Sequence, residues 1–187
     1  MKLSPIPNFA FVSLEEANAL HKWKATLQIP NNSLISSWIP LPLNSSVSVP
    51  CTSWFGIVCN ADGSIKNLNI SASGLKANNF SGVIPPEIGT MLYNLEIFYL
   101  NGNNLSGSIP REIGQLTSLY KLQLSDNFLQ GELPPTLGNL TKLVHLYQYN
   151  NKLLGEILSS LGDLTSLNVI YLDHNQLSGP IPIEVGN

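Results

Sequence analysis

The chain has 187 residues, of which 43% are hydrophobic, enough for one folded domain or for a small cap joined to an array of repeats. Only 11% of the residues are charged, where about a quarter is usual, so uncharged polar side chains must provide much of the solvation. The formal net charge is −3 and the basic residues are scattered singly. This pattern argues against nucleic acid or an anionic membrane surface as a partner.

The N-terminal segment resembles an export signal only weakly. Lys2 is followed by two prolines and by one short apolar run over 9–12. We expect residues 1–13 to be a leader or its remnant, so either the export signal is degenerate or the true start lies upstream. The uncharged stretch over 29–61 contains four prolines and many Asn and Ser residues, so no direct membrane insertion is expected.

A helical cap is predicted next, within residues 14–64. Ser13-x-x-Glu16 forms a capping box, and Pro30 stops the helix. The helical spacing is carried by Ala17, Leu20, Lys24 and Leu27. The end of a repeat array must be covered, and we expect the apolar residues of the cap to do so: Trp23, Leu34, Trp38 and Trp54.

The two cysteines, Cys51 and Cys59, either form one short disulfide or remain free thiols. A zinc site needs four ligands, and no other Cys or His pair has suitable spacing, so no metal is expected. We favour the disulfide, which indicates an oxidising compartment and stabilises the fold by about 2 to 3 kcal/mol. Six Asn-x-Ser/Thr sequons indicate the same compartment: Asn31, Asn44, Asn69, Asn79, Asn104 and Asn139.

One pattern is repeated four times from Leu95 onward. The segment over 95–110 reads Leu-x-x-Phe-x-Leu-x-x-Asn-x-Leu-x-Gly-x-Ile-Pro, and similar copies cover 119–134, 143–157 and 167–182. The central asparagines recur every 24 residues, as in leucine-rich repeats: Asn103, Asn127, Asn151 and Asn175. The sequence therefore predicts an α/β leucine-rich-repeat solenoid over 65–187. We expect a right-handed curved array of about five repeats, the last incomplete, with a parallel β-sheet on its concave face.

Each copy begins with a short strand that has one buried face. Leu122 and Leu124 point inward, whereas Lys121, Gln123 and Ser125 point outward. Stacking such strands in parallel buries the leucines against the neighbouring repeats. The asparagine amide, which has both donors and an acceptor, is expected to pair with the backbone where the chain turns inside the fold.

Two repeats depart from this pattern. In the first, the pattern fits Ile65, Leu68, Ile70, Ser73 and Leu75. It fits again five residues later at Asn78, Phe80, Gly82, Ile84 and Pro85. In a later repeat Gln148 occupies the place of an inward leucine. The packing below Gln148 is therefore in question.

The outward strand positions form three rows, which are Ile97, Lys121, His145, Val169; Tyr99, Gln123, Tyr147, Tyr171; and Asn101, Ser125, Tyr149, Asp173. Tyrosine offers a large apolar area and a hydroxyl, which suits a binding surface, although exposed tyrosines also simply favour strands. A glycan on Asn69 would stand on this face and block the first repeat. The predicted binding residues are Tyr99, Lys121, Gln123, His145, Tyr147, Tyr149, Tyr171 and Asp173.

An enzymatic function is not supported by the residues. His21 lies on the cap helix, His145 on an outward strand position and His174 beside Asn175. No carboxylate and nucleophile are placed by the pattern to act with them, so we expect surface histidines.

The cap segments over 15–24 (EEANALHKWK), 37–38 (SW) and 50–60 (PCTSWFGIVCN) resemble the N-terminal cap of plant leucine-rich-repeat receptor-like kinases. The Leu-x-Gly-x-Ile-Pro ends are similar to the plant-specific repeat, and the likeness covers nearly the whole chain from Leu14. The resemblance implies an ectodomain that perceives peptides or partner ectodomains and signals to a cytoplasmic kinase. The chain itself has no Gly-rich nucleotide loop, His-Arg-Asp or Asp-Phe-Gly motif, so no enzyme and no cofactor are expected.

The expected partners are thus a peptide or protein ligand and a co-receptor ectodomain. The expected location is extracellular or apoplastic, and the plasma membrane if the chain is part of a full-length receptor. An alternative is a secreted inhibitor of microbial cell-wall hydrolases, similar to the polygalacturonase-inhibiting proteins. An ice-binding solenoid would require flat, regular rows of Thr, and the rows here are mixed.

Overall fold

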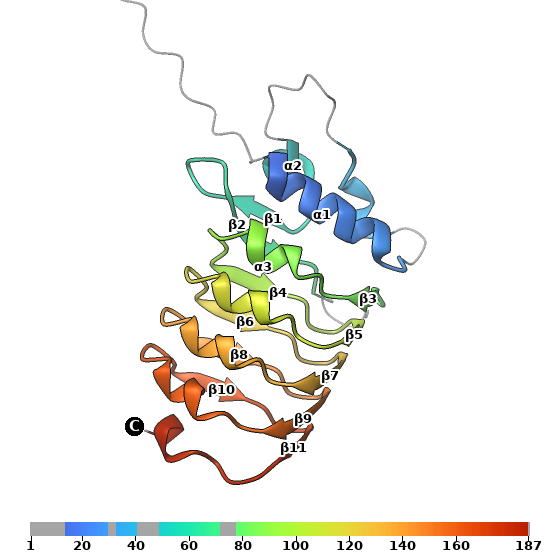
Figure 1. The fold of residues 1–187 in the computed structure, drawn as a ribbon. Coiled ribbons are helices and arrows are strands. Elements are labelled where there is room, and N and C mark those ends of the chain that lie inside the picture. Colours follow the sequence, from blue (N-terminus) through green and yellow to red (C-terminus); the bar gives the residue numbers. More distant parts are fainter. Residues whose placement is uncertain (1–13, 30–32, 41–48, 72–77, 187) are drawn as a thin grey trace, which may run out of the picture.

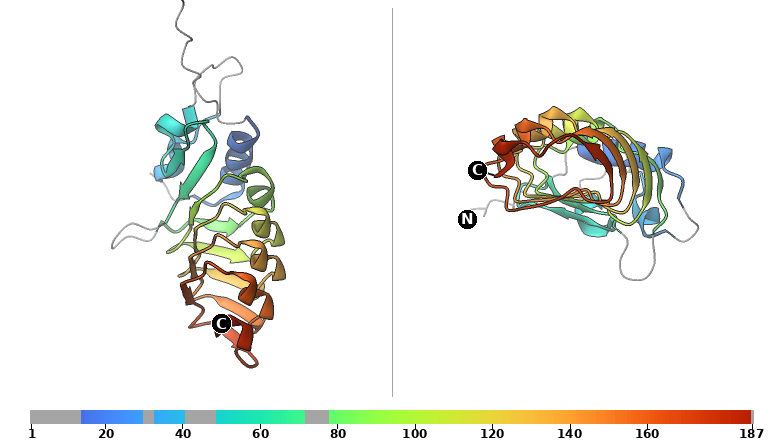
Figure 2. Two further views of the ribbon diagram at one scale, coloured as in Figure 1. Left: turned by 90° about the vertical axis from the view of Figure 1, so that its left-hand side faces the viewer. Right: turned by 90° about the horizontal axis from the view of Figure 1, so that it is seen from below.

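The computed structural model describes residues 14–29, 33–40, 49–71 and 78–186, which form a solenoid with a cap at its N-terminal end (Figure 1). Each repeat adds one layer further from the cap, and the helical turns lie on the side opposite the main sheet (Figure 2). The expected leader over 1–13 and the sequons at Asn31 and Asn44 lie outside the described residues.

The cap contains the predicted helix, α1 (Leu14–Thr26), followed by the 3-10 turn η1 (Leu34–Ser37), the short helix α2 (Val49–Ser53) and strand β1 (Ile57–Cys59). Glu16 is fully buried, and its Oε1 accepts a hydrogen bond of 3.3 Å from the backbone N–H of Ile65. The carboxylate of Glu16 therefore connects the cap to the first strand of the repeats. Ser13 of the expected capping box lies outside the described residues.

Three buried tryptophans fill the cap. Trp38 and Trp54 stack with their ring centroids 5.7 Å apart. Trp23 Nε1 donates a hydrogen bond to the carbonyl of Val83, so it joins the cap to the repeats. The prediction that Leu34 also covers the array is wrong, because Leu34 is 47% exposed; the turn η1 directs the next residue, Ile35, into the core instead.

The disulfide predicted between Cys51 and Cys59 is confirmed. It joins α2 to β1, with the two Cα atoms 5.5 Å apart. Strand β1 in turn pairs antiparallel with the first repeat strand, so the disulfide lies at the edge where the main sheet begins.

The main sheet has six strands in the order β1-β2-β4-β6-β8-β10, and all but β1 run parallel. Each repeat contributes one strand to it, which confirms the predicted parallel sheet; we call its outward surface the concave face. The repeat strands are β2 (Ile65–Asn69), β4 (Ile97–Tyr99), β6 (Lys121–Gln123), β8 (His145–Tyr147) and β10 (Val169–Tyr171).

A second parallel sheet of five strands lies on the flank, in the order β11-β9-β7-β5-β3. The repeat pattern did not predict this second sheet. Its strands are β3 (Ser81–Val83), β5 (Asn104–Gly107), β7 (Phe128–Glu132), β9 (Lys152–Glu156) and β11 (Gln176–Ser178). The convex side has one short α-helix and four 3-10 turns, namely α3 (Glu87–Met91), η2 (Arg111–Gln115), η3 (Pro135–Asn139), η4 (Ser159–Asp163) and η5 (Ile183–Gly186).

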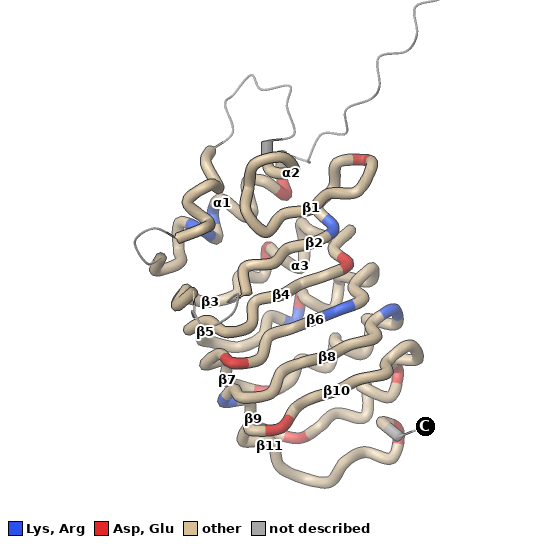
Figure 3. The backbone as a smooth tube through the Cα atoms, turned by 180° about the vertical axis from the view of Figure 1, so that it is seen from behind, with Lys and Arg blue, Asp and Glu red and all other residues tan. Residues whose placement is uncertain are grey.

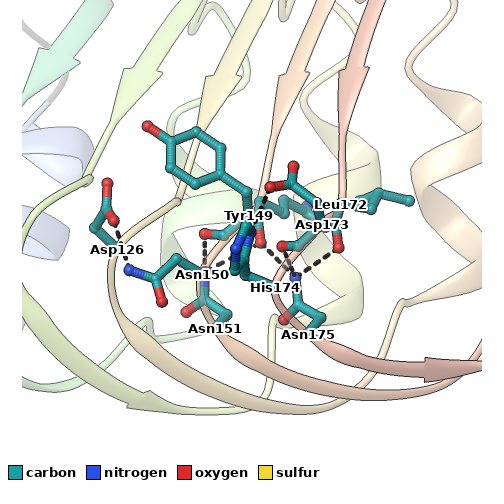
Figure 4. A network of polar contacts seen from close by, with 9 residues as sticks. Asp126, Tyr149, Asn150, Asn151, Leu172, Asp173, His174 and Asn175 are labelled. Atoms are coloured by element: carbon teal, nitrogen blue, oxygen red, sulfur yellow. Dashed lines mark hydrogen bonds and ion pairs between the residues drawn. The ribbon is translucent and has the colours of Figure 1, made fainter.

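A ladder of asparagine side chains runs through the solenoid where the chain leaves the main sheet (Figure 4). Asn127 is buried, and its Nδ2 donates to the carbonyls of Leu100 and Leu124 at 3.0 and 3.1 Å. Its Oδ1 accepts from the N–H of Leu105 at 3.0 Å. One side chain thus satisfies the backbone of its own repeat and of the preceding one.

The other repeats have the same arrangement. Asn103 donates to the carbonyls of Ile70 and Leu100, and its Oδ1 accepts from the N–H of Phe80. Asn151 and Asn175 make the equivalent bonds one and two repeats beyond Asn127. Asn78, which sequence reasoning did not include in the ladder, donates to the carbonyl of Ile70 and so extends the ladder into the first repeat.

Asn78 also locates the irregularity of the first repeat. It follows Ile70 by eight residues, whereas Asn103 follows Leu100 by three, so about five additional residues separate the strand from the ladder. Residues 72–77 of this segment lie outside the described residues.

Gln148 is fully buried at the position that Leu100 and Leu124 occupy in other repeats. Neither its Oε1 nor its Nε2 has a hydrogen-bond partner among the described residues. A buried amide without partners destabilises the folded state, because it loses its bonds to water and gains none in return. The doubt that the sequence raised about this layer therefore has a physical cause.

We predict that Gln148→Leu raises the free energy of unfolding by about 1 to 3 kcal/mol, because leucine fills the same site without a stranded polar group. Urea unfolding followed by circular dichroism measures the change. Gln130→Leu, which alters an exposed glutamine on β7, serves as the matched control. A loss of stability in Gln148→Leu would show that the amide has partners.

We predict that Asn127→Ala lowers the free energy of unfolding by about 1 to 3 kcal/mol, because it strands the buried backbone groups of Leu100 and Leu105. Asn168→Ala, at an exposed position next to β10, is the control and should leave the unfolding midpoint unchanged. Equal midpoints for both variants would show that the ladder contributes nothing to stability.

Candidate functional site: the concave face

The register of the main sheet places the predicted outward positions side by side. One row consists of residues that pair from strand to strand: Tyr99 on β4, Gln123 on β6, Tyr147 on β8 and Tyr171 on β10. Asn69 on β2 pairs with Tyr99 and begins this row. Ile97, Lys121, His145 and Val169 form the neighbouring row in the same way. The side chains that alternation predicted to face outward thus share one surface.

The third row, Asn101, Ser125, Tyr149 and Asp173, lies in the turns that follow the strands. The residue before each ladder asparagine has positive φ, with values of 72° at Gly102, 56° at Asp126, 53° at Asn150 and 54° at His174. Glycine, Asp, Asn and His adopt this left-handed conformation more readily than other residues. The N–H of Asp126 donates to the carbonyl of Tyr149, and that of Asn150 to the carbonyl of Asp173, so the turns align the third row between repeats.

Ser125, predicted to face outward in this row, lies on the same side as the Gln123 side chain but is not exposed. Ser125 is fully buried, and its Oγ donates to Gln123 Oε1 at 2.8 Å. The strand has ended at Gln123, and the carbonyl of Ser125 accepts bonds from the N–H of Gly102 and from Asn127 Nδ2. Neighbouring side chains therefore cover Ser125, so it offers no surface to a partner.

Five aromatic rings form a continuous cluster over β6, β8 and β10. The His145 ring stacks on Tyr147 with centroids 5.8 Å apart, and Tyr120 meets His145 edge-on at 5.8 Å. Tyr147 contacts Tyr171 at 5.3 Å, and Tyr149 contacts Tyr171 at 6.4 Å. Such contacts between rings hold each ring in place. We call these residues the aromatic cluster.

The hydroxyl groups of the cluster are also constrained. Tyr147 Oη lies 3.2 Å from His145 Nδ1. Burial raises the pKa of the neighbouring Tyr99, and the proximity of Tyr147 and Tyr120 raises it further, so Tyr99 keeps its proton at physiological pH. Tyr99 therefore presents a neutral hydroxyl group that can donate and accept hydrogen bonds.

Sequence reasoning missed Tyr120, which is 43% exposed and lies at the start of the cluster. Strict alternation from Lys121 onward does not include Tyr120, but both residues between the inward leucines Leu119 and Leu122 face outward here. The Leu-x-x-Leu spacing was the signal that could have identified Tyr120.

The other predicted functional features lie away from the cluster. Asn79, Asn104 and Asn139 are exposed but do not lie on the main sheet, whereas Asn69 is exposed at the end of β2 on the concave face. His174 Nδ1 lies 2.6 Å from Asp173 Oδ2. The described residues contain no group of three or more metal-ligating side chains. No helix within them is long and apolar enough to span a membrane.

Family models match both parts of the chain. A model described as leucine rich repeat N-terminal domain matches residues 13–60. A model described as leucine rich repeat matches 94–116, 118–140 and 166–187. The matched segments thus include the cap and three of the repeats.

Similar proteins come from plants. The chain is 40% identical over 100 residues to a probable leucine-rich repeat receptor-like protein kinase of Arabidopsis thaliana, and this alignment covers 43% of the chain and 9% of the relative. The plant peptide hormone receptor RGFR1, whose structure is known in complex with RGF2, is 41% identical to this chain with a TM-score of 0.57. That alignment covers 58% of this chain and 17% of the RGFR1 chain.

A closer match in length is a chain of the BIR3–SERK2 complex from Arabidopsis thaliana. It is 33% identical with a TM-score of 0.77, and the alignment covers 90% of this chain and 86% of that one. Cap, repeats and fold therefore agree with one group of proteins: the chain belongs to the family of plant leucine-rich-repeat receptor-like kinase ectodomains.

Proposed function

We propose that this chain is an extracellular recognition module, part of the ectodomain of a receptor-like kinase, that binds a peptide or protein partner through its concave face. The aromatic cluster is the observation that carries this proposal. Its rings are held by one another, while Tyr171 remains 52% exposed and Tyr120 43% exposed. A partner can therefore cover apolar area with little loss of side-chain entropy.

The related proteins support the same interpretation. RGFR1 is a peptide hormone receptor, and BIR3 and SERK2 form a complex with each other. By analogy, the partners of this chain are a peptide ligand and a co-receptor ectodomain. Receptor kinases among the relatives favour a receptor over a secreted inhibitor of microbial hydrolases.

The Cys51–Cys59 disulfide supports an oxidising, extracellular location, because such bonds rarely persist in the cytosol. The sequons at Asn104 and Asn139 agree with this location. Glycans there would leave the aromatic cluster accessible, because neither residue lies on the main sheet. A glycan on Asn69 would instead lie beside Tyr99, which is its partner in register, and would restrict binding to the later repeats.

The size of the surface limits what these repeats bind alone. Neighbouring strands are about 4.8 Å apart, so the four strands from β4 to β10 span about 15 Å. This width accommodates a few residues of a peptide. We infer that high affinity depends on further repeats or on a second receptor chain.

We predict that Tyr147→Ala weakens partner binding by 1 kcal/mol or more, on the order of a fivefold rise in Kd, because Tyr147 lies at the centre of the cluster. The measurement uses the secreted protein and peptides selected on it from a display library, with Kd determined by calorimetry. Circular dichroism establishes that the variant is folded.

Phe128→Ala is the matched control, since Phe128 is an exposed aromatic residue on the flanking sheet. Thr141→Ala, at an exposed position two residues after the convex turn η3, tests the convex side. Both should leave Kd unchanged. If Thr141→Ala abolishes binding while Tyr147→Ala has no effect, recognition occurs elsewhere and the proposed site is wrong.

A further inference from the structure

The flanking sheet presents an exposed aromatic side chain. Phe128 begins β7 and is 47% exposed, whereas the next residue, Leu129, is buried. On the neighbouring strands β5 and β3, Figure 3 shows no charged residue. The surface on this side of Phe128 is therefore solvated by uncharged polar groups.

One of these uncharged groups belongs to a glycosylation sequon, Asn104-Leu105-Ser106. Asn104 is exposed at the first position of β5, and Leu105 is buried. Strand alternation therefore directs the Asn104 and Ser106 side chains to the same outer surface. The described residues offer the Asn104 amide no hydrogen bond, so it is free to carry a modification.

The register of the flanking sheet places this sequon beside Phe128. Ser106 is the Cα partner of Phe128, and Asn104 lies two residues before Ser106. The Cα atoms of such diagonal neighbours are about 8 Å apart, a distance that long side chains reach across. Ser106 Oγ donates to the carbonyl of Gly82 at 3.3 Å, so this side chain is turned toward β3 rather than toward the Phe128 ring.

Lys152 contacts the same ring from the opposite direction. Its Nζ lies 5.0 Å from the centre of the Phe128 ring. Lys152 belongs to β9, whereas Asn104 belongs to β5, and β7 lies between these two strands. A group attached to Asn104 therefore approaches the ring from the other neighbouring strand and does not compete with Lys152.

N-acetylglucosamine, the first sugar of an N-linked glycan, suits this place chemically. Its ring has an apolar face of C–H groups with small positive partial charges, whereas the face of an aromatic ring is negative. Packing the two together removes apolar area of both from water. The sugar hydroxyl groups remain at the outer surface, where they provide the solvation that charged residues do not.

We propose that Asn104 carries an N-linked glycan whose first N-acetylglucosamine packs on the ring of Phe128. The transfer forms a bond between Asn104 Nδ2 and C1 of the sugar and breaks the bond between C1 and the diphosphate of a lipid-linked oligosaccharide donor. The amide loses one proton, and the lipid diphosphate leaves. The glycan covers Phe128 and excludes partner proteins from this part of the flanking sheet. The inference rests on the extracellular location proposed above, but not on binding at the concave face.

Two other exposed sequons, at Asn79 and Asn139, lack such a neighbour and provide matched controls. Asn79 is followed by Phe80, which is buried, and the strands β3 and β5 beside it contain no aromatic residue. Asn139 ends η3, and the adjoining turns η2 and η4 contain no aromatic residue.

The first test is glycopeptide mapping of the full chain, secreted from plant cells behind an added export signal. We expect Asn104 to be modified, and digestion with an endoglycosidase to leave one N-acetylglucosamine on it. An unmodified Asn104 in the secreted chain would overturn the proposal.

The second test compares the thermal unfolding of the digested protein and its variants. We expect Phe128→Ala to lower Tm by about 2 to 4 °C more in the glycosylated protein than in the Asn104→Gln background, because only the former loses a contact between sugar and ring. In the Asn139→Gln background, Phe128→Ala should lower Tm as much as in the wild type. Equal effects in the wild-type and Asn104→Gln backgrounds would show that the sugar does not pack on the ring.

Nuclear Overhauser measurements detect the contact itself. With isotope-labelled sugars, we expect cross-peaks between the protons of N-acetylglucosamine and those of the Phe128 ring. The cross-peaks should disappear in Phe128→Leu, which keeps an apolar side chain without the ring, and persist in Asn79→Gln and Asn139→Gln. A modified Asn104 without these cross-peaks would contradict the proposal.

These outcomes are independent of recognition at the aromatic cluster. If Asn104 is unmodified, or its sugar does not contact Phe128, this inference is wrong and the effect of Tyr147→Ala on partner binding still decides the proposed function. If Tyr147→Ala leaves partner binding unchanged while the cross-peaks are present, the proposed binding site is wrong and the glycan contact stands.

Discussion

The asparagine ladder is the interaction on which the rest of the structure depends. A solenoid must turn its chain through the interior once per repeat, and each turn leaves backbone groups away from water. The amides of Asn103, Asn127, Asn151 and Asn175 bond to those groups in two repeats at once. This bonding keeps every strand in register with its neighbour, and register decides which side chains share the concave face.

The same constraint holds the concave face in one arrangement, so the binding proposed for it requires no rearrangement of the strands. The ladder and the left-handed turns beside it hold the backbone of each strand end, and contacts between rings hold Tyr147 and Tyr171 above it.

The repeat pattern predicted the main sheet, its register and the position of the aromatic rows, because period and alternation are properties of local sequence. It could not predict features that depend on how the chain leaves a strand. Ser125 is fully buried although its Oγ bonds to the outward side chain of Gln123, and the residues after the ladder pair into a second sheet. In the cap, where no period exists, the sequence could not show that Ile35 rather than Leu34 faces inward.

The most direct test of this account is a crystal structure of the secreted protein bound to a display-selected peptide. The account predicts peptide carbon atoms within about 4 Å of the rings of Tyr147 and Tyr171, the contact distance of packed side chains, with the hydrogen bonds of Asn127 and Asn151 unchanged. A peptide bound to the convex 3-10 turns or to the flanking sheet, with the aromatic cluster uncovered, would contradict it.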